Sequence, residues 1–534
     1  ESQWIDGDFV RFRYGLPEKI GGWEQLTNSN NTLPGAARAQ HAFTSIAGEK
    51  YVAIGTSQGL FLYYEGEFVD ITPIDNDVIT GANFSTTSGS PTVTVNKTSH
   101  GLLDGRYVTF SSVTVPTGSG YATTDFTNNT FEVLNKTNDT FQITMPTNSA
   151  GATSGTGSAQ IDPYIIIGPT FQTAGFGWGT ASWGGASGVT STLNGALSDN
   201  TSGTGGSGTS ITLTSTTNFP ITGGTIRVGA EYISYTGITG NNLTGITRAV
   251  AGTRSAHSSG ASVEFYIAWG QQSLTSTVTL DPGLWSLDNF GQILVATIHN
   301  GETFTWNSGT SSARNVRATI MANAPTKTRL TQVSDRDRHV FHFGTETTIG
   351  NSTTQDPMFI RFSDQENFNE YQPTAVNTAG TFRLDKGNEI VGAVSGKDYT
   401  LVLTDTSAYV IQYVGPPFTF SIRQVGTNCG LIGQNALSYS NGIVFWMSGE
   451  GGFFMFDGTV KALPCLVEDF VFTTSTDNLG INFNSSQLVY AEHNSLYNEI
   501  NWFYASSNSE QINRCVVYNY AEKLWTTSSL ARTS

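Results

Sequence analysis

Cysteine is scarce in this chain of 534 residues, which contains only Cys429, Cys465 and Cys515. The three residues lie far apart, with no Cys-x-x-Cys pair and no Cys/His spacing typical of a zinc site. This pattern argues against both a zinc module and a disulfide framework. We expect three buried thiols in a reducing compartment.

Charged residues are also few, since Asp, Glu, Lys and Arg make up 13% of the chain. The 26 Lys and Arg residues against 42 Asp and Glu residues give a net charge of -16, and no basic block offsets it. Stable binding to nucleic acid or to anionic membranes is therefore disfavoured, because Lys and Arg side chains hold those partners.

Long apolar runs are missing as well. No segment approaches about 18 consecutive apolar residues, and the N-terminus lacks the charged, apolar and small-residue regions of a secretory signal. We therefore predict no membrane insertion by this chain. The chain starts at Glu1 instead of Met, so we expect the native N-terminus to lie further upstream.

Turn and strand residues are abundant. The chain contains 59 Gly residues and 12% aromatic residues, together with many Ser, Thr and Asn. This composition is typical of a large all-β protein rich in turns and differs from that of a helical enzyme.

An apolar strand, a short polar turn and a second apolar strand recur six times. From Ile293 onward the first strands of these pairs are spaced by roughly 43 to 61 residues, which is the length of a four-stranded propeller blade. The sequence therefore predicts an all-β fold, namely a β-propeller of about six blades. The six pairs are Tyr51–Gly55 with Gly59–Tyr64, Gln292–Ala296 with Glu302–Trp306, His339–Phe343 with Met358–Phe362, Thr400–Thr404 with Tyr409–Tyr413, Ile443–Met447 with Gly452–Phe456, and Ile500–Tyr504 with Cys515–Tyr520.

The interval between the first two pairs is too long for one blade, and it holds a Ser/Thr/Gly-rich insertion. The alternation of Phe9–Tyr14 indicates a strand, which we expect to complete the last blade near Trp525, because an open ring would expose sheet edges. The predicted parts are a closing strand and first blade over 1–76, a β module over 77–162, an aromatic and Gly-rich connector over 163–195, a second β module over 196–268, and the remaining blades over 269–534.

Several segments resemble virion structural proteins of tailed phages. Trp4–Trp23 with Ala37–His41 resembles the opening of such proteins, and Phe362–Asn367 with Pro373–Gly380 resembles a second stretch of them. The segment Gly426–Gly458 is similar to the propeller of the tail nozzle, or tail hub, proteins of short-tailed phages, also described as packaged-DNA stabilisation proteins. The resemblance covers roughly 4–76 and 270–534, and it includes no catalytic motif.

The resemblance implies a structural role in the phage tail. A member of this family would form a sixfold homo-oligomeric ring beneath the portal and adaptor, with tail fibres or spikes around it. The ring would retain packaged DNA and then form the channel for genome ejection, with the DNA passing through without specific binding. The protein would be assembled in the host cytoplasm and reside in the virion, and it would not be an enzyme.

Two Gly-rich motifs match patterns found in other classes of protein. Gly55–Gly59 matches the Gly-x-Ser-x-Gly pattern of serine hydrolases, which requires a strand, a sharp turn and then a helix. A strand follows here instead, so we predict a β-hairpin turn. Gly203–Gly208 matches a dinucleotide-binding pattern but lies in a Ser/Gly/Thr stretch, where a linker is expected.

Three groups of polar residues could carry chemistry. His339 and His342 are three residues apart, which on a strand places them on opposite faces and disfavours a shared metal. The carboxylates of one connection, Asp335 and Asp337, and of another, Asp364, Glu366 and Glu370, could form an acid/base pair or a calcium site, although turn carboxylates exposed to water are the simpler interpretation. We predict no catalytic, cofactor-binding or metal-binding residues and no cofactor.

Four tryptophans, Trp285, Trp306, Trp446 and Trp502, could line a sugar-binding groove or pack blade against blade. Alternation with polar residues favours packing. Two rival functions remain open. A host-surface adhesin would use the propeller as a scaffold and bind glycan, and a glycan-cleaving enzyme would need two convergent carboxylates that the sequence does not reveal.

Overall fold

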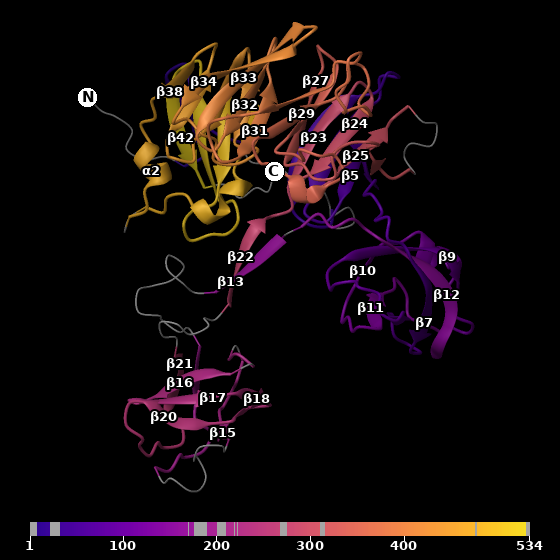
Figure 1. Cartoon of the computed structure of the whole chain (residues 1–534), viewed down its shortest axis with the longest axis vertical. Helices are drawn as coiled ribbons and strands as arrows, with labels where there is room; N and C mark the ends of the chain where they lie inside the picture. The colour runs from indigo at the N-terminus through magenta and orange to yellow at the C-terminus, as the bar shows by residue number, and fades with distance from the viewer. Residues whose placement is uncertain are drawn as a thin grey trace. The chain divides into compact units, whose positions relative to one another are not determined.

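The computed structural model of the chain describes residues 8–21, 33–168, 170–175, 189–199, 210–217, 219–221, 223–266, 275–309, 316–475 and 478–529. These ranges form an all-β structure with two short α-helices, α1 (Thr123–Thr127) and α2 (Glu468–Phe472) (Figure 1). Two short 3-10 helices, η2 (Ser352–Thr354) and η3 (Phe483–Leu488), are also present. The prediction of an all-β fold is therefore confirmed.

Six four-stranded antiparallel sheets, here called sheets I to VI, are each built from consecutive strands in chain order. Sheet I contains β3 (Ala37–Thr44), β4 (Lys50–Thr56), β5 (Leu60–Tyr64) and β6 (Glu67–Asp70); sheet II contains β23 (Trp285–Phe290), β24 (Ile293–Ile298), β25 (Thr303–Asn307) and β26 (Thr319–Ile320); sheet III contains β27 (Leu330–Ser334), β28 (His339–Phe343), β29 (Phe359–Phe362) and β30 (Gly380–Arg383). Sheet IV contains β31 (Ile390–Ser395), β32 (Thr400–Thr404), β33 (Ser407–Gly415) and β34 (Thr419–Thr427); sheet V contains β35 (Leu437–Ser440), β36 (Ile443–Met447), β37 (Phe453–Phe456) and β38 (Val460–Leu463); sheet VI contains β39 (Tyr490–Asn494), β40 (Glu499–Tyr504), β41 (Arg514–Asn519) and β42 (Leu524–Ser528).

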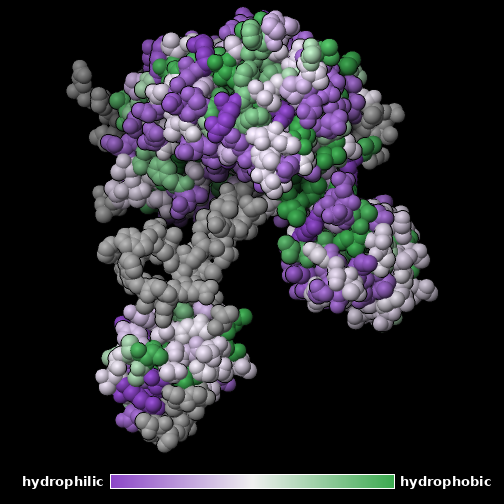
Figure 2. All heavy atoms as spheres, in the orientation of Figure 1, coloured by the Kyte–Doolittle hydropathy of each residue, from purple (hydrophilic) through white to green (hydrophobic). Residues whose placement is uncertain are grey.

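The strand pairs found in the sequence are the second and third strands of these six sheets. These strands read as continuous apolar runs because both of their faces are covered. Every residue of β28 and of β40 is buried. The core clusters accordingly extend from one sheet to the next: one joins sheets I and II, another sheets II and III, a third sheets III and IV, and the largest joins sheets IV, V and VI. On the visible face of these sheets, hydrophilic and hydrophobic residues are interspersed (Figure 2).

Tryptophan side chains connect consecutive sheets by hydrogen bonds as well as by packing. The indole of Trp285 in sheet II donates to the carbonyl of Thr56 in sheet I, at 2.9 Å. A buried indole N–H without a partner costs free energy, so this hydrogen bond helps to fix how sheet II lies on sheet I. Three more indoles donate to the segments before or after sheet V: Trp446 to Cys429, Trp502 to Ala436 and Trp525 to Pro464.

The N-terminal strand does not complete the last sheet, and this prediction is wrong in its pairing. β1 (Val10–Arg13) pairs with β2 (Leu16–Lys19) in a two-stranded hairpin, while sheet VI is complete with its own four strands. The location is nevertheless close to the expected one. Arg11 forms a buried ion pair with Glu499 of β40, with Nε and Oε1 3.1 Å apart, and the hairpin contacts β42, the strand that contains Trp525.

The first inserted module is a six-stranded sheet in the order β10-β9-β12-β7-β8-β11. Its outermost strands approach each other, because an isolated bridge joins Leu134 to Gln142, so the sheet nearly closes into a barrel. Aromatic residues such as Phe84, Phe110 and Phe126 fill its core. The strands are β7 (Ile79–Thr86), β8 (Thr92–Asn96), β9 (Tyr107–Thr114), β10 (Phe131–Glu132), β11 (Thr140–Thr144) and β12 (Thr153–Pro163).

The second inserted module belongs to a separate compact unit, Thr170–Leu280. It contains a five-stranded and a three-stranded sheet that share one core around Ile226, Ile233 and Phe265. The five-stranded sheet has β14 (Thr190–Thr192), β21 (Ser262–Tyr266), β16 (Gly224–Val228), β17 (Glu231–Tyr235) and β20 (Thr247–Ala251), and the three-stranded sheet has β15 (Ile211–Thr212), β19 (Asn242–Thr244) and β18 (Gly237–Thr239).

Two predicted boundaries need correction. The second module begins before 196, because β14 pairs with β21 and Leu193 lies in the module core, so the end of the predicted connector 163–195 belongs to it. The predicted start of the remaining blades at 269 is also too early. β22 (Thr275–Asp281) pairs with β13 (Thr170–Gly175), and sheet II starts only at Trp285.

The tryptophan contacts between sheets yield a stability prediction. We expect Trp285→Ala to cost about 3–5 kcal/mol of local stability, because it opens a cavity between sheets I and II. Trp285→Phe should cost less, since it removes mainly the hydrogen bond to Thr56. Hydrogen exchange of the amides in β4 and β23 measures both effects. Ile46→Ala, a change at an exposed side chain, is the control and should stay within about 0.5 kcal/mol. Equal protection in the Trp285→Ala variant and this control would contradict the prediction.

Candidate functional site

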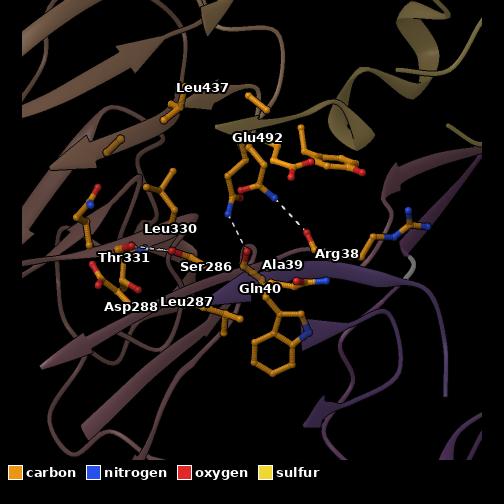
Figure 3. A pocket seen from close by; sticks show the side chains of 17 residues that line it. Arg38, Ala39, Gln40, Ser286, Leu287, Asp288, Leu330, Thr331, Leu437 and Glu492 are labelled. Carbon is orange, nitrogen blue, oxygen red and sulfur yellow. Dashed lines mark hydrogen bonds between the residues drawn. The ribbon is translucent and has the colours of Figure 1, made fainter. Parts of the chain in front are cut away.

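One cavity of about 430 Å³ is lined by residues from the first strands of all six sheets (Figure 3). Each first strand also contacts the first strand of the following sheet, from β3 with β23 to β35 with β39. The cavity is therefore the place where all six sheets meet. One lining residue from each strand, in order, is Ala39, Ser286, Thr331, Ala393, Leu437 and Ala491.

Hydrogen bonds connect sheets across this cavity. Two amide side chains that precede sheet V make them: Asn435 Nδ2 donates to the carbonyl of Arg38 in sheet I, at 3.2 Å, and Gln434 Nε2 donates to the carbonyl of Trp285 in sheet II, at 3.1 Å (Figure 3). The Gln434 Oε1 atom also lies 3.0 Å from Nδ1 of His299. Any chain threaded through the cavity would have to break these bonds.

The charged groups of the cavity are Arg38, Asp288 and Glu492. Asp288 in β23 accepts a hydrogen bond from the backbone N–H of Val333, at 2.8 Å, which joins sheet II to sheet III. Burial raises the pKa of the Asp288 carboxyl, although this hydrogen bond and the nearby His41 act in the opposite direction. The wall is therefore polar, and hydrogen bonds between the sheets hold it in place. A polar cavity of this kind is suited to ordered water molecules.

The size of the cavity limits what it can hold. A volume of about 430 Å³ has room for water molecules on the order of a few tens at most. Duplex DNA has a major groove that alone is about 12 Å wide, and it does not fit a space of this volume that is also crossed by hydrogen bonds. A route for DNA through the centre of a single chain is therefore excluded.

The Gly55–Gly59 motif forms a β-hairpin turn between β4 and β5, as predicted. The Thr56 backbone N–H donates to the Gly59 carbonyl at 2.8 Å, and the Thr56 hydroxyl accepts from the Gly59 N–H at 2.9 Å. The corresponding turn of sheet IV repeats the second contact, with Thr404 accepting from Ser407 at 2.8 Å. This shared turn explains the motif without a nucleophile. The Gly203–Gly208 motif lies outside the described residues.

The two histidines of β28 occupy opposite faces of sheet III, as predicted. His339 packs against Phe420 of sheet IV, and its Nε2 lies 3.1 Å from the Thr378 hydroxyl. His342 faces the other way, edge-on to Tyr371, and both of its ring nitrogens are buried without a hydrogen-bond partner. Burial, together with the neighbouring Arg361, lowers the pKa of His342 to about 3, so the ring is neutral at physiological pH.

The predicted carboxylate clusters lie in connections of sheet III, as expected. Asp337 accepts a hydrogen bond from the Ser334 hydroxyl, at 3.2 Å. Asp364 accepts from both the backbone N–H and the hydroxyl of Thr378, and Glu366 pairs with Arg338. These contacts explain the carboxylates as turn-stabilising groups. In the described part of the chain, no three His, Cys, Asp or Glu residues are grouped so that they could hold a metal ion.

Trp285, Trp306, Trp446 and Trp502 are all buried, as expected for packing between sheets. Trp285 also contributes to the wall of the central cavity. Cys429 and Cys515 are buried, whereas Cys465 is half-buried. Burial raises the pKa of the Cys429 thiol to about 11, so it stays protonated at neutral pH. No helix of the described ranges could cross a membrane.

A buried charge network in the second module was not found from the sequence. The Arg248 guanidinium binds both carboxylate oxygens of Glu231, at 2.6 and 2.7 Å, and both side chains are fully buried. His257 Nε2 lies 2.8 Å from Glu231 Oε2 and 3.4 Å from the Ser255 hydroxyl. Because both contacts use the same ring nitrogen, the histidine cannot relay a proton from serine to glutamate as in a hydrolase triad.

Comparisons with known proteins identify no family. No protein-family model matches the sequence, and no curated protein matches it. Among solved structures, the chain is similar to the AfRom2 CNH domain, with 9% identity over 46% of this chain and 84% of that chain and a TM-score of 0.28. It is also similar to a mutant of Synechocystis apocarotenoid oxygenase, with 10% identity over 56% of this chain and 72% of that chain and a TM-score of 0.27. These likenesses are too weak to support an argument about function.

The Glu231 network yields a prediction about pH. Burial alone raises the pKa of Glu231, but hydrogen bonds from Arg248, His257 and the Ser255 backbone outweigh it and lower the pKa below the ordinary value of 4.5. The stabilisation is therefore fully present above pH 4.5 and is lost as the pH falls through the lower pKa of the folded state. We expect the hydrogen-exchange protection of β16, β17 and β20 to decrease over that acidic range.

Substitution tests the same network at neutral pH. Glu231→Gln leaves the Arg248 charge buried without its anion, which should cost about 3–5 kcal/mol of local stability. Glu264→Gln is the matched control, because the Arg227–Glu264 pair in the same sheet is exposed to solvent and its loss should cost far less. Unchanged protection in the Glu231→Gln variant at neutral pH would show that the network does not stabilise the module.

Proposed function

We propose that this chain is a structural protein of a phage tail and that several copies form the nozzle, or tail hub. The observation that supports the proposal is the framework of six consecutive four-stranded sheets around a small central cavity, with hydrogen bonds joining the sheets across it. Such a framework is a rigid block suited to form part of a wall. The resemblance of Trp4–Trp23 and Gly426–Gly458 to tail nozzle proteins adds the biological context.

The same framework supports a six-bladed β-propeller as the fold. In a propeller each blade is a four-stranded meander whose first strand lies innermost. The six meanders, their contacting first strands and their shared cavity are the features that this arrangement requires. The inserted modules leave the framework between β6 and β23, which corresponds to the junction of the first two blades.

The proposal places the DNA channel between copies of the chain. The centre of one chain is too small for a duplex, so the genome would pass through an opening framed by a sixfold homo-oligomeric ring. The net charge of -16 favours passage, because a lumen that repels phosphate weakly does not retain the duplex by affinity. The ring would adjoin the adaptor and portal, with tail fibres or spikes around it, and would have no enzymatic activity.

Electron microscopy of the purified full-length chain tests this function. We expect rings of six copies with a central opening wide enough for duplex DNA. We also expect no DNA binding at physiological salt in filter-binding assays, because non-specific binding depends on Lys and Arg contacts with phosphates, and the net charge of -16 opposes them. A chain that stays monomeric at all concentrations, or that degrades polysaccharide, would overturn the proposal.

A glycan-binding adhesin is the second candidate, and the separate compact unit Thr170–Leu280 favours it. A domain of this kind can be presented away from a scaffold to contact a host surface. Saturable binding of the purified chain to whole host cells, lost when this unit is removed, would support the adhesin function. Absence of such binding in a chain that forms rings would leave the nozzle as the better proposal.

A further inference from the structure

His342 is buried at the interface between sheets II and III, here called the II–III interface. The residue belongs to β28, the second strand of sheet III, and none of its side chain is exposed to solvent. Val340, on the same face of β28, packs with Phe290 and Val295 of sheet II in one core cluster. Because alternate residues of a strand share a face, the His342 ring points into this interface as well. A titratable group therefore lies where two sheets meet.

Hydroxyl groups form part of the surroundings of this ring. Thr331 of β27 lies opposite His342 in the strand pairing. Its hydroxyl oxygen is 2.7 Å from that of Thr297 in sheet II, which is in turn 2.9 Å from that of Thr303. These neutral groups bind one another, and neither ring nitrogen of His342 has a hydrogen-bond partner among the described residues.

A cation lies beside the ring on the neighbouring strand. Arg361 of β29 is paired with His342 in the strand register and is only 3% exposed. Its guanidinium donates to the backbone carbonyls of Tyr371, Glu346 and Thr347, at 3.3, 3.3 and 2.9 Å. A proton on His342 would therefore place a second positive charge beside one that is already buried.

The carboxylates of these two sheets have other partners. Glu346 accepts a hydrogen bond from a backbone N–H at 2.7 Å, and Asp288 accepts one from another at 2.8 Å. Burial raises the pKa of Asp288, so acid neutralises this carboxyl and acts in the opposite direction to a proton on His342. At the border of the interface, Arg338 is paired with Glu366.

His339, on the same strand but the opposite face, provides a contrast. Its Nδ1 lies 2.6 Å from the carbonyl oxygen of Asp337, and its Nε2 lies 3.1 Å from the Thr378 hydroxyl. Burial lowers the pKa of His339, but the nearby carboxylates of Asp337 and Asp364 act in the opposite direction. His339 can therefore hold a proton more readily than His342.

We propose that acid opens the II–III interface and that His342 is the group that senses it. A protonated ring would add a cation beside Arg361 in a space from which water is excluded, with no described acceptor facing it. Such a charge is costly to bury. When the sheets separate, the ring meets water and can take up the proton. This inference is independent of the proposed tail function.

The direction of the pH effect follows from the two states of the ring. Burial and the neighbouring Arg361 lower the pKa of His342 from 6.5 to about 3 while the interface is closed. The opened interface restores the ordinary value. The closed state is therefore fully stable above that ordinary value, and its stability is lost as the pH falls toward the lower one. Each pH unit within this range should increase the opening constant about tenfold.

Oxidation of buried methionines by hydrogen peroxide measures this opening in the full-length chain. Met321 belongs to the core cluster of the II–III interface and Met358 to the cluster between sheets III and IV, and both are 2% exposed. A thioether does not titrate in this pH range, so the rate of sulfoxide formation follows exposure. When the pH falls from about 6.5 to about 4.5, we expect the rate at Met321, measured by mass spectrometry, to rise up to about a hundredfold. The rate at Met358 should change far less.

Two substitutions separate His342 from the other titrating groups. His342→Phe keeps a ring without its nitrogens, and His342→Gln keeps a smaller polar group without a titratable proton. In both variants the oxidation rate of Met321 should become nearly independent of pH. His339→Phe is the matched control, because it makes the same change on the opposite face of β28. This control should keep the wild-type pH response at Met321.

Three results would overturn the proposal. The first is an oxidation rate at Met321 that does not respond to pH in the wild-type chain. The second is a response that persists in both His342 variants. The third is an equal rise at Met358, which would indicate general unfolding and not the opening of one interface. Each of these results leaves the proposed ring to its own test by electron microscopy.

Discussion

Burial of the second strand of each sheet on both faces is the constraint on which the framework depends. A strand such as β40, with every residue buried, cannot border water on either side, so each sheet must be covered by its neighbours. The core clusters accordingly run from sheet to sheet, and indole hydrogen bonds fix how the sheets stack. The rest of the molecule is organised around this stack.

The same constraint determines what the centre can do. First strands that meet one another leave only a small polar cavity, and Asn435 and Gln434 extend across it to the backbone of sheets I and II. These contacts make the framework rigid, and they leave no wide central opening in a single chain. A function that requires a wide channel must therefore come from several copies, and this consideration connects the architecture to the proposed ring.

Much of the framework could be predicted because its strands appear as local patterns of apolar residues and turns in the sequence. The paired apolar strands around Ile293, His339 or Ile500 are visible as short runs of apolar residues separated by turns, and all six pairs form neighbouring strands. The role of Trp285, Trp446 and Trp502 was likewise predicted. The pairing of Phe9–Tyr14 was not predicted. A two-residue turn at Tyr14 and Gly15 brings the next strand alongside it, so its backbone hydrogen bonds are made within the hairpin and not with sheet VI.

The sequence by itself determined the all-β class, the sixfold repeat and the presence of an insertion, since these depend on periodicity and spacing along the chain. Only the tertiary structure decided which parts of the chain meet: Glu231 with Arg248 and His257, and the six first strands around one cavity. The physical reason is that such contacts join residues on different strands, whose pairing and packing no single stretch of sequence specifies. No local pattern encodes them, because each depends on how complete sheets pack.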